Sequence, residues 1–509
     1  MNMSDTVVWT APDENFWELE LVHFPRPVPR AFRDVFAAAA SEGLAESCER
    51  YGVPLNSFFF SFVNDRMYQR LEPVMDPDEM ARRAATASDV FEERRWRADV
   101  RRWREITKPA RIDANLRRQR VDLAALNDSE LDAELTAALD NLRAGTLEHM
   151  RLVFAVDVCL GDFLARADEW GLDTKELLGL LAGASPASGE ATRMIADGDI
   201  AGFRELHGWR SPAYDPSVPT LGEHERALDQ AITAAKRRPP HAKDSPATAG
   251  GLAALRARVP AVARDEFDDL LSEATSVYGV RDENESPTLL WPVGLLRRVL
   301  LEIAARLVAR GLLEERDDVF FAERDEIGAL LHRQGGAPQA DELAERRRHA
   351  WLLSADAPLS LGTDPGPPPP LDVFPEGMRS VARAAMTTGA LEYATMGGVG
   401  DDGVLTGIGI GEQRYRGRAC VASSPADALD RLEEGDVLVI TSTNSALDPI
   451  LALAGALVVE EGGPWTHAAI VARELGLPAV VGARGALSAV HEGDVVEVDG
   501  VTGTVRRLT

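Results

Sequence analysis

The chain has 509 residues, of which 45% are hydrophobic and 27% are charged, a composition typical of a folded protein. This length exceeds what one hydrophobic core usually serves, so we expect two or three domains. The formal net charge of -27, from 82 acidic and 55 basic residues, disfavours nucleic acids and anionic membrane surfaces as partners.

Cysteine usage and the N-terminal segment bear on the compartment. Cys48, Cys159 and Cys420 lie far apart and lack metal-like spacing, which argues against a disulfide framework and against a cysteine-ligated metal site. The opening MNMSDTVVWTAPDENFWELE is acidic and has no apolar core like that of a signal peptide. No stretch reaches the roughly 18 apolar residues of a transmembrane helix. We therefore expect a cytoplasmic protein with no metal site of its own.

Residues from about 31 to 347 are expected to be mainly helical. In Val293–Leu313, VGLLRRVLLEIAARLVARGLL, apolar residues recur at three- and four-residue steps with arginines between them. This spacing predicts an amphipathic helix that ends near Gly311. Similar runs predict helices in Asp128–Phe163 and in Glu223–Lys236.

Two segments interrupt the helical pattern. Lys236–Gly251, KRRPPHAKDSPATAGG, is polar and rich in proline and glycine, which predicts an exposed, mobile loop. Ser354–Pro375 contains PGPPPP and predicts a stiff, extended spacer. We therefore place a helical domain at 1–353 and a proline-rich linker and connecting segment at 354–402. Such a link suits a domain that changes position, but a passive spacer has the same composition.

After residue 400 short β-branched runs alternate with turns, which predicts a compact α/β domain over 403–509. A helix is expected at His467–Leu475, HAAIVAREL. The predicted fold class is therefore multi-domain, with a large mainly α-helical domain and a C-terminal α/β domain. The expected strands are Asp436–Thr441, Ala456–Glu460, Pro478–Val481, Asp494–Val498 and Thr504–Leu508.

The passage with the clearest chemistry is VVEEGGPWTHAAIVARELGLPAVVG. Gly462 and Gly463 follow a strand and permit a tight turn, and Thr466 is a reasonable N-cap for the next helix. His467 then lies in the first turn, beside free backbone N–H groups that favour an anion. Its imidazole is a nucleophile near neutral pH, because the usual histidine pKa is about 6.5 and the helix dipole disfavours protonation. A histidine used only for packing or hydrogen bonding is the alternative.

GGPWTHAAIVARELGLPAVVG resembles the phosphohistidine signature of the phosphoenolpyruvate-utilising enzyme family, and the similarity extends over Gly403–Arg507. The resemblance implies a swivelling phosphohistidine domain in which His467 accepts a phosphoryl group. Thr466 matches the Ser or Thr that precedes the histidine in the family. We assign both residues to the catalytic set. The phosphate-binding set that we expect is Gly462, Gly463 and Arg473, with a mainly structural duty for the arginine.

The helical part resembles the acceptor-binding domain of rifampicin phosphotransferase-like proteins, in Leu295–Ile327 and in Phe16–Phe32. That domain carries an arginine followed by an acidic residue and, a few positions on, a lysine. Here Arg281 and Asp282 fit, whereas Glu285 or a neighbour stands in the lysine's place. We assign Arg281 to the catalytic set, because a guanidinium can neutralise a transferring phosphoryl group. A structural arginine is an equal alternative.

No glycine-rich phosphate loop with a lysine occurs in the sequence. The resemblance then implies a split system like phenylphosphate synthase, in which a separate ATP-grasp subunit holds ATP and Mg²⁺ and this chain binds neither. His467 would pass the phosphoryl group to a small hydroxyl-bearing acceptor. Two alternatives stay open. One is a condensing enzyme that activates its substrate by phosphorylation, and the other is a non-catalytic binding or regulatory relative.

Other candidate features are ambiguous. The aromatic residues of FFFSF, together with Trp209 and Trp291, are suited either to an apolar acceptor pocket or to a helical core. Five histidines show no metal-binding spacing and are treated as structural: His149, His207, His224, His332 and His349.

Overall fold

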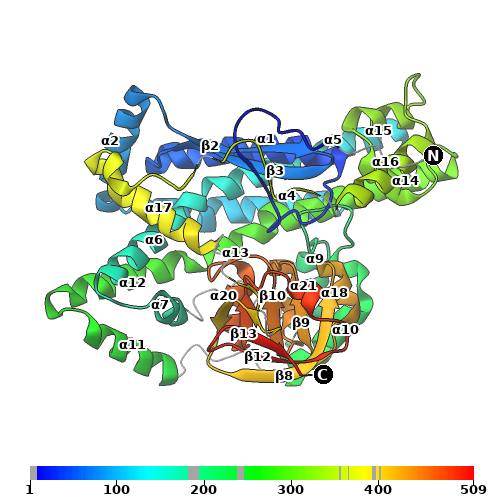
Figure 1. Cartoon of the computed structure of the whole chain (residues 1–509). Helices are drawn as coiled ribbons and strands as arrows, with labels where there is room; N and C mark the ends of the chain where they lie inside the picture. Colours follow the sequence, from blue (N-terminus) through cyan, green and yellow to red (C-terminus); the bar gives the residue numbers. More distant parts are fainter. Residues whose placement is uncertain are drawn as a thin grey trace.

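The computed structural model describes residues 8–181, 194–195, 197–237, 246–354, 357–364, 366–392, 397–400 and 403–508. Residues 8–392 form a mainly helical domain, and residues 397–508 form a C-terminal α/β domain that lies against it (Figure 1). The predicted fold class is confirmed.

Long helices form the framework of the helical domain. Helix α5 begins with a capping box, in which the side chain of Asn127 accepts from the backbone of Glu130 and that of Glu130 accepts in return. Helix α14 continues from α13 through a π-helical turn at Ser286–Leu290. The helices are α1 (Arg30–Tyr51), α2 (Pro77–Glu93), α3 (Trp96–Arg102), α4 (Lys108–Gln119), α5 (Asp128–Arg151), α6 (Val153–Glu169), α7 (Thr174–Leu180), α9 (Ile200–His207), α10 (Glu225–Arg237), α11 (Pro246–Arg258), α12 (Arg264–Tyr278), α13 (Val280–Glu285), α14 (Trp291–Ala309), α15 (Arg324–Leu331), α16 (Ala340–Ser354) and α17 (Arg379–Glu392).

A small sheet that the sequence reasoning missed covers α1. Its strands have the order β2-β3-β1-β4 and comprise β1 (Trp17–Leu19), β2 (Leu55–Val63), β3 (Arg66–Pro73) and β4 (Ser360–Leu361). The FFFSF run lies on β2 and pairs antiparallel with β3, so it is a strand and not a helix. Phe60 and Phe62 nevertheless pack against the core, as the second alternative expected. A continuous aromatic run has neither the helical nor the alternating period, so its periodicity does not separate strand from helix.

The C-terminal domain is built on a nine-stranded mixed sheet of order β5-β6-β13-β12-β8-β9-β10-β11-β7. Strands β8 to β11 run parallel at its centre, and the outer pairs are antiparallel. All five predicted strands are present. The strands are β5 (Gly398–Val399), β6 (Leu405–Thr406), β7 (Ile408–Ile410), β8 (Arg414–Ala422), β9 (Val437–Ile440), β10 (Ala456–Val459), β11 (Ala479–Val481), β12 (Val495–Asp499) and β13 (Thr504–Arg507). The helices are α18 (Pro425–Arg431), α19 (Asp448–Leu451), α20 (His467–Leu475) and α21 (Ala486–Ala489).

The segment predicted as a linker is more structured than expected. Strand β4 pairs with β1, and α17 packs so closely on α6 that a Cβ atom at Gly161 would come within 2.1 Å of the carbonyl oxygen of Ala384. The segment thus adds to the helical domain, and part of it lies outside the described residues. Of the predicted loop Lys236–Gly251, residues 238–245 also lie outside them, and helix α11 begins at Pro246.

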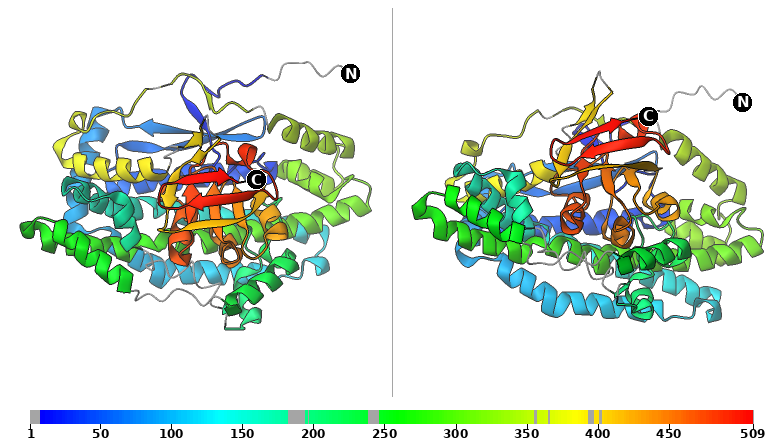
Figure 2. Two further views of the ribbon diagram at one scale, coloured as in Figure 1. Left: turned by 60° about the horizontal axis from the view of Figure 1, so that its bottom comes forward. Right: turned by 90° about the horizontal axis from the view of Figure 1, so that it is seen from below.

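The two domains share apolar contacts. The C-terminal domain lies below α13, with α10 on one flank (Figures 1 and 2). Helix α10 packs on α19, and the rings of Tyr278 and Trp465 have centroids 5.2 Å apart. Among the described residues, no helix has the length and hydropathy needed to cross a membrane.

Candidate active site between the two domains

His467 is the first residue of α20, as its sequence context predicts. Strand β10 ends at Val459, and Gly462 then adopts a φ of +96°, a region that favours glycine. Thr466 occupies the N-cap position, but its hydroxyl donates to the carbonyl oxygen of Gly463 over 2.8 Å and makes no side-chain cap. This bond fixes the turn that presents His467 at the domain interface.

Both ring nitrogens of His467 have partners from the same domain. Nδ1 lies 2.9 Å from the hydroxyl of Thr443, and Nε2 lies 2.9 Å from a carboxylate oxygen of Asp448. The side chains of His467 and Asp448 are only 9% and 4% exposed. The ring is therefore held in one orientation by a hydroxyl on one side and a carboxylate on the other.

The charge state of His467 differs from the one predicted. Burial by itself lowers the pKa of His467, but the charges of Asp448, Asp282 and Glu285 outweigh it and raise the pKa to about 9. Burial raises the pKa of Asp448 to about 6, against the opposing effect of His467. The expectation that the ring stays neutral was wrong, because the carboxylates around it favour its protonated form. Near neutral pH the ring in this position is an imidazolium.

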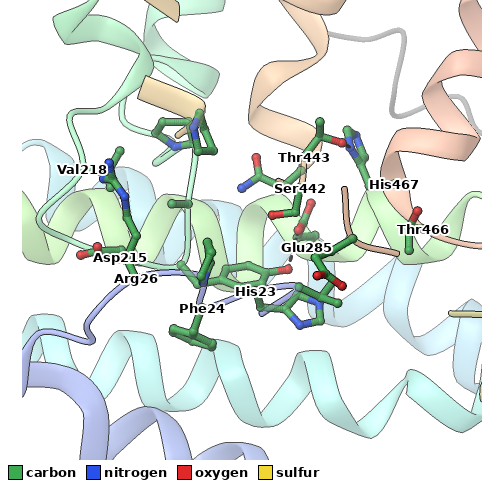
Figure 3. Close-up of a pocket in the computed structure, with 18 of the residues that line it drawn as sticks. His23, Phe24, Arg26, Asp215, Val218, Glu285, Ser442, Thr443, Thr466 and His467 are labelled. Atoms are coloured by element: carbon green, nitrogen blue, oxygen red, sulfur yellow. Dashed lines mark hydrogen bonds between the residues drawn. The ribbon is translucent and has the colours of Figure 1, made fainter. Parts of the chain in front are cut away.

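The helical domain supplies most of the walls of a cavity next to His467. The cavity has a volume of about 100 Å³. Figure 3 shows His467, Thr443 and Glu285 on one side of it and Arg26, Asp215 and Val218 on the other. Besides His467, its lining combines apolar residues with two guanidinium groups, those of Arg26 and Arg281. A concave, partly apolar cavity with a few convergent polar groups is typical of a small-molecule site.

Glu285 lies in the stretch where Glu285 or a neighbour was expected to replace a lysine, and its carboxylate joins the two domains. One oxygen accepts from the backbone N–H and the hydroxyl of Ser445, over 3.1 and 2.5 Å. The other accepts from the hydroxyl of Tyr214 over 2.5 Å. Burial raises the pKa of Glu285. The charge of His467 and these hydrogen bonds have the larger opposite effect, so the pKa lies below its ordinary value. Glu285 is therefore ionised in this position.

Arg281 lies at the same interface. Its guanidinium lies over the ring of Trp465, 5.6 Å from the centroid, and 3.9 Å from the carboxylate of Asp157. Asp282, beside it, is buried and lines the cavity. The side chain of Arg281 is 27% exposed, so a charged group that enters the cavity can reach it.

The structure brings three of the predicted site residues together, namely His467, Thr466 and Arg281, which all line the cavity. Gly462 and Gly463 shape the turn before α20 and do not line the cavity. Arg473 lies near the end of α20 and donates to the carbonyl oxygen of Pro464 over 2.8 Å, so it supports that turn. A phosphate-binding role for these three residues stays a prediction.

Sequence reasoning missed several residues of the site. Asp448 and Ser445 lie in the β9–β10 connection, and Tyr214 comes from a segment with no recognisable motif. His23 and Arg26 lie within Phe16–Phe32, whose resemblance did not identify individual site residues. The signal for Glu285 was the missing lysine in its stretch of the chain. His149, which was treated as structural, also lines the cavity, and burial lowers its pKa to about 4.

The aromatic candidates lie elsewhere. Neither the FFFSF run nor Trp209 nor Trp291 is part of the cavity lining. Trp291 is buried at the start of α14, where it belongs to the helical core. In the part of the chain that the structure describes, no three His, Cys, Asp or Glu side chains are grouped so as to hold a metal ion.

Comparison with known proteins gives the C-terminal domain a family. Residues 432–503 match the model described as the PEP-utilising enzyme, mobile domain. The chain carries a PEP-utilising enzyme mobile domain. The match includes α20 and both ring partners of His467, so the hydrogen bonds that orient the ring lie within the mobile domain.

Three relatives add to the comparison, and two of them match more residues than the C-terminal domain contains. Rifampicin phosphotransferase of Streptomyces sviceus is 29% identical over 245 residues, 48% of this chain and 25% of that protein. Prodigiosin synthesizing transferase PigC of Serratia marcescens is 28% identical over 236 residues, 45% of this chain and 24% of that protein. A probable phosphoenolpyruvate synthase of Pyrococcus abyssi is 45% identical over 102 residues, 20% of this chain and 12% of that protein.

The chain spans a quarter or less of the length of these three relatives. Together with the mobile domain, they support an enzyme of the phosphoryl-transfer type.

Proposed function

We propose that this chain is the histidine-carrying, acceptor-binding component of an ATP-dependent phosphotransferase. His467 takes a phosphoryl group from ATP and Mg²⁺ held by a nucleotide-binding module on a separate subunit. The mobile domain then carries the group to the cavity, where a small hydroxyl-bearing acceptor receives it. The observation that carries the proposal is the position of His467, at the start of α20 and facing a cavity that both domains line.

The chemistry proceeds in two half-reactions. In the first, a neutral ring nitrogen of His467 attacks the donor's phosphorus, and the bond from phosphorus to the leaving oxygen breaks. In the second, the acceptor's hydroxyl oxygen attacks phosphorus and the N–P bond breaks. The hydroxyl proton goes to the His467–Asp448 pair. The ring is then an imidazolium, the form that the surrounding carboxylates favour in this position.

The charges around His467 favour the second half-reaction at this site. A phosphoryl group on the ring brings negative charge next to Asp448, Asp282 and Glu285, whereas an imidazolium is stabilised by them. The docked position therefore suits the removal of the phosphoryl group from the histidine better than its loading. Arg281 faces the same cavity and is suited to neutralise the group in transit.

The test is intact-mass analysis after incubation of the purified protein with ATP, Mg²⁺ and host extract, before and after brief acid treatment. His491→Ala is the matched control, because His491 lies in the mobile domain with its side chain 68% exposed. We expect an acid-labile phosphoryl adduct on the wild type and on the control, and none on His467→Ala. Absence of the adduct from the wild type under these conditions would refute the proposal.

A condensing enzyme is the second candidate, favoured by the similarity to a prodigiosin synthesizing transferase and by the missing lysine in Tyr278–Trp291. Product analysis separates the two functions. A phosphotransferase accumulates the phosphorylated acceptor, whereas a condensing enzyme releases inorganic phosphate as it joins two substrates. A purely binding or regulatory relative would form neither product and would carry no phosphoryl group on His467.

A further inference from the structure

Glu285 has the strongest unexplained arrangement in the structure. It is a buried carboxylate of the helical domain with three hydrogen-bond donors, and two of these belong to Ser445 of the mobile domain. Glu285, Ser445 and Tyr214 are 8%, 6% and 7% exposed. Hydrogen bonds to an ionised group in such surroundings are stronger than neutral ones, and removing a partner leaves a buried charge poorly satisfied.

The segment that Glu285 binds is directly coupled to His467. Ser445 opens the short helical turn Ser445–Leu447, and Asp448 follows as the first residue of α19. Asp448 is the residue that bonds Nε2 of His467. A short rigid segment therefore contacts the helical domain through Ser445 and the reactive ring through Asp448. Fixing Ser445 fixes the position of the ring relative to the cavity.

Other polar contacts between the domains lie nearer the rim. His224 pairs with Asp430 over 2.8 Å, but the side chain of Asp430 is 65% exposed. Arg226 and Glu433 are 3.5 Å apart and both are exposed. Exposed ion pairs contribute little to stability, because water and salt screen them. These contacts do not determine where His467 lies.

We propose that Glu285 is a positioning residue that latches the mobile domain, through Ser445, in the place where His467 faces the cavity. Its effect on phosphoryl transfer rests on the function proposed above, whereas the docking itself does not. When the mobile domain moves away, Glu285 keeps its hydrogen bond from Tyr214, and water molecules replace the two donors of Ser445.

Hydrogen–deuterium exchange on the full chain, unphosphorylated and without ATP, tests the latch. In Glu285→Gln we expect exchange to rise about 10-fold in the two facing segments, 277–285 and 444–451, because the charge-assisted bonds are weakened. Exchange in the central strands β9 and β10 should stay unchanged. Ser445→Ala should give a smaller rise in the same two segments, and the double variant should add little to Glu285→Gln, since both changes act on one contact.

Glu433→Gln is the matched control, because it removes a carboxylate from the exposed rim of the same interface. It should leave both segments at the wild-type rate. The proposal is overturned if Glu285→Gln behaves like this control, or if exchange rises equally in β9 and β10, which would mean general destabilisation.

A separate mass measurement should show that Glu285→Gln still receives a phosphoryl group on His467 but loses it more slowly to an acceptor. Failure of loading in every variant would count against the proposed function and leave the latch intact.

Discussion

Asp448→Asn tests the charge balance that protonates His467. The carboxylate of Asp448 lies 2.9 Å from Nε2, and both side chains are buried. The rise in the pKa of His467 from 6.5 to about 9 corresponds to about 3 kcal/mol in favour of the protonated ring. In Asp448→Asn we expect that pKa to fall to 6.5 or below. Burial then outweighs the remaining carboxylates.

The measurement is an NMR titration of the protein with ¹³C-labelled histidine. The chain has nine histidines, and His467→Ala identifies the signal of interest by its absence. Thr443→Val is the control, because it removes the hydroxyl beside Nδ1 and leaves every charge in place. It should keep the pKa near 9. The reasoning fails if the wild-type ring titrates near 6.5, or if Asp448→Asn and Thr443→Val have the same effect.

The same balance gives a pH dependence of stability. The pKa of His467 is higher in the folded protein than the ordinary value of 6.5, so folding favours the bound proton. This stabilisation is complete below about pH 6.5 and is lost as the pH rises through about 9. In urea unfolding, the difference between wild type and His467→Ala should therefore shrink by about 3 kcal/mol between pH 6 and pH 10. A constant difference would contradict the charge assignment.

Three further substitutions test the turn, the packing and the cavity. Gly462→Ala should lower the free energy of unfolding by about 2 kcal/mol, more than Gly493→Ala, because a Cβ atom at the first site meets a side chain at 2.6 Å while the second faces open space. Gly161→Ala should loosen α17 and raise its amide exchange, whereas Gly179→Ala, with nothing within 4 Å, should not. Arg281→Ala should slow phosphoryl discharge from His467 by about 100-fold in a single-turnover assay, with little change in loading.

The sequence predicted the C-terminal domain well because its signals are local. Helix α20 has the bounds expected for it, and each predicted β-branched run contains a strand. The small sheet was missed because FFFSF shows no clear period and because β4, which completes the sheet, comes from the distant proline-rich segment. Contacts between segments so far apart in the chain leave no trace in local periodicity.

The site was predictable only in part, for the same reason. A single motif identifies His467, but its ionisation depends on Asp448 of α19 and on Asp282 and Glu285 of α13. Their effect reverses what the helix dipole alone suggests. Glu285 was noticed only as a departure from a pattern, and its bond to Ser445 follows from docking, which no short sequence window contains.

The proposed cycle asks His467 to be a neutral nucleophile at the donor and a good leaving group at the acceptor. Two of the three carboxylates that raise its pKa, those of Asp282 and Glu285, belong to the helical domain. A mobile domain that moves away leaves both behind and exposes the ring to water, so the pKa of His467 falls toward its ordinary value and the neutral ring becomes available. On docking, the carboxylates return and favour the imidazolium, which is the form left once the phosphoryl group has departed. The direction of transfer then follows from the position of the domain, because each position stabilises the form of the histidine that its half-reaction requires.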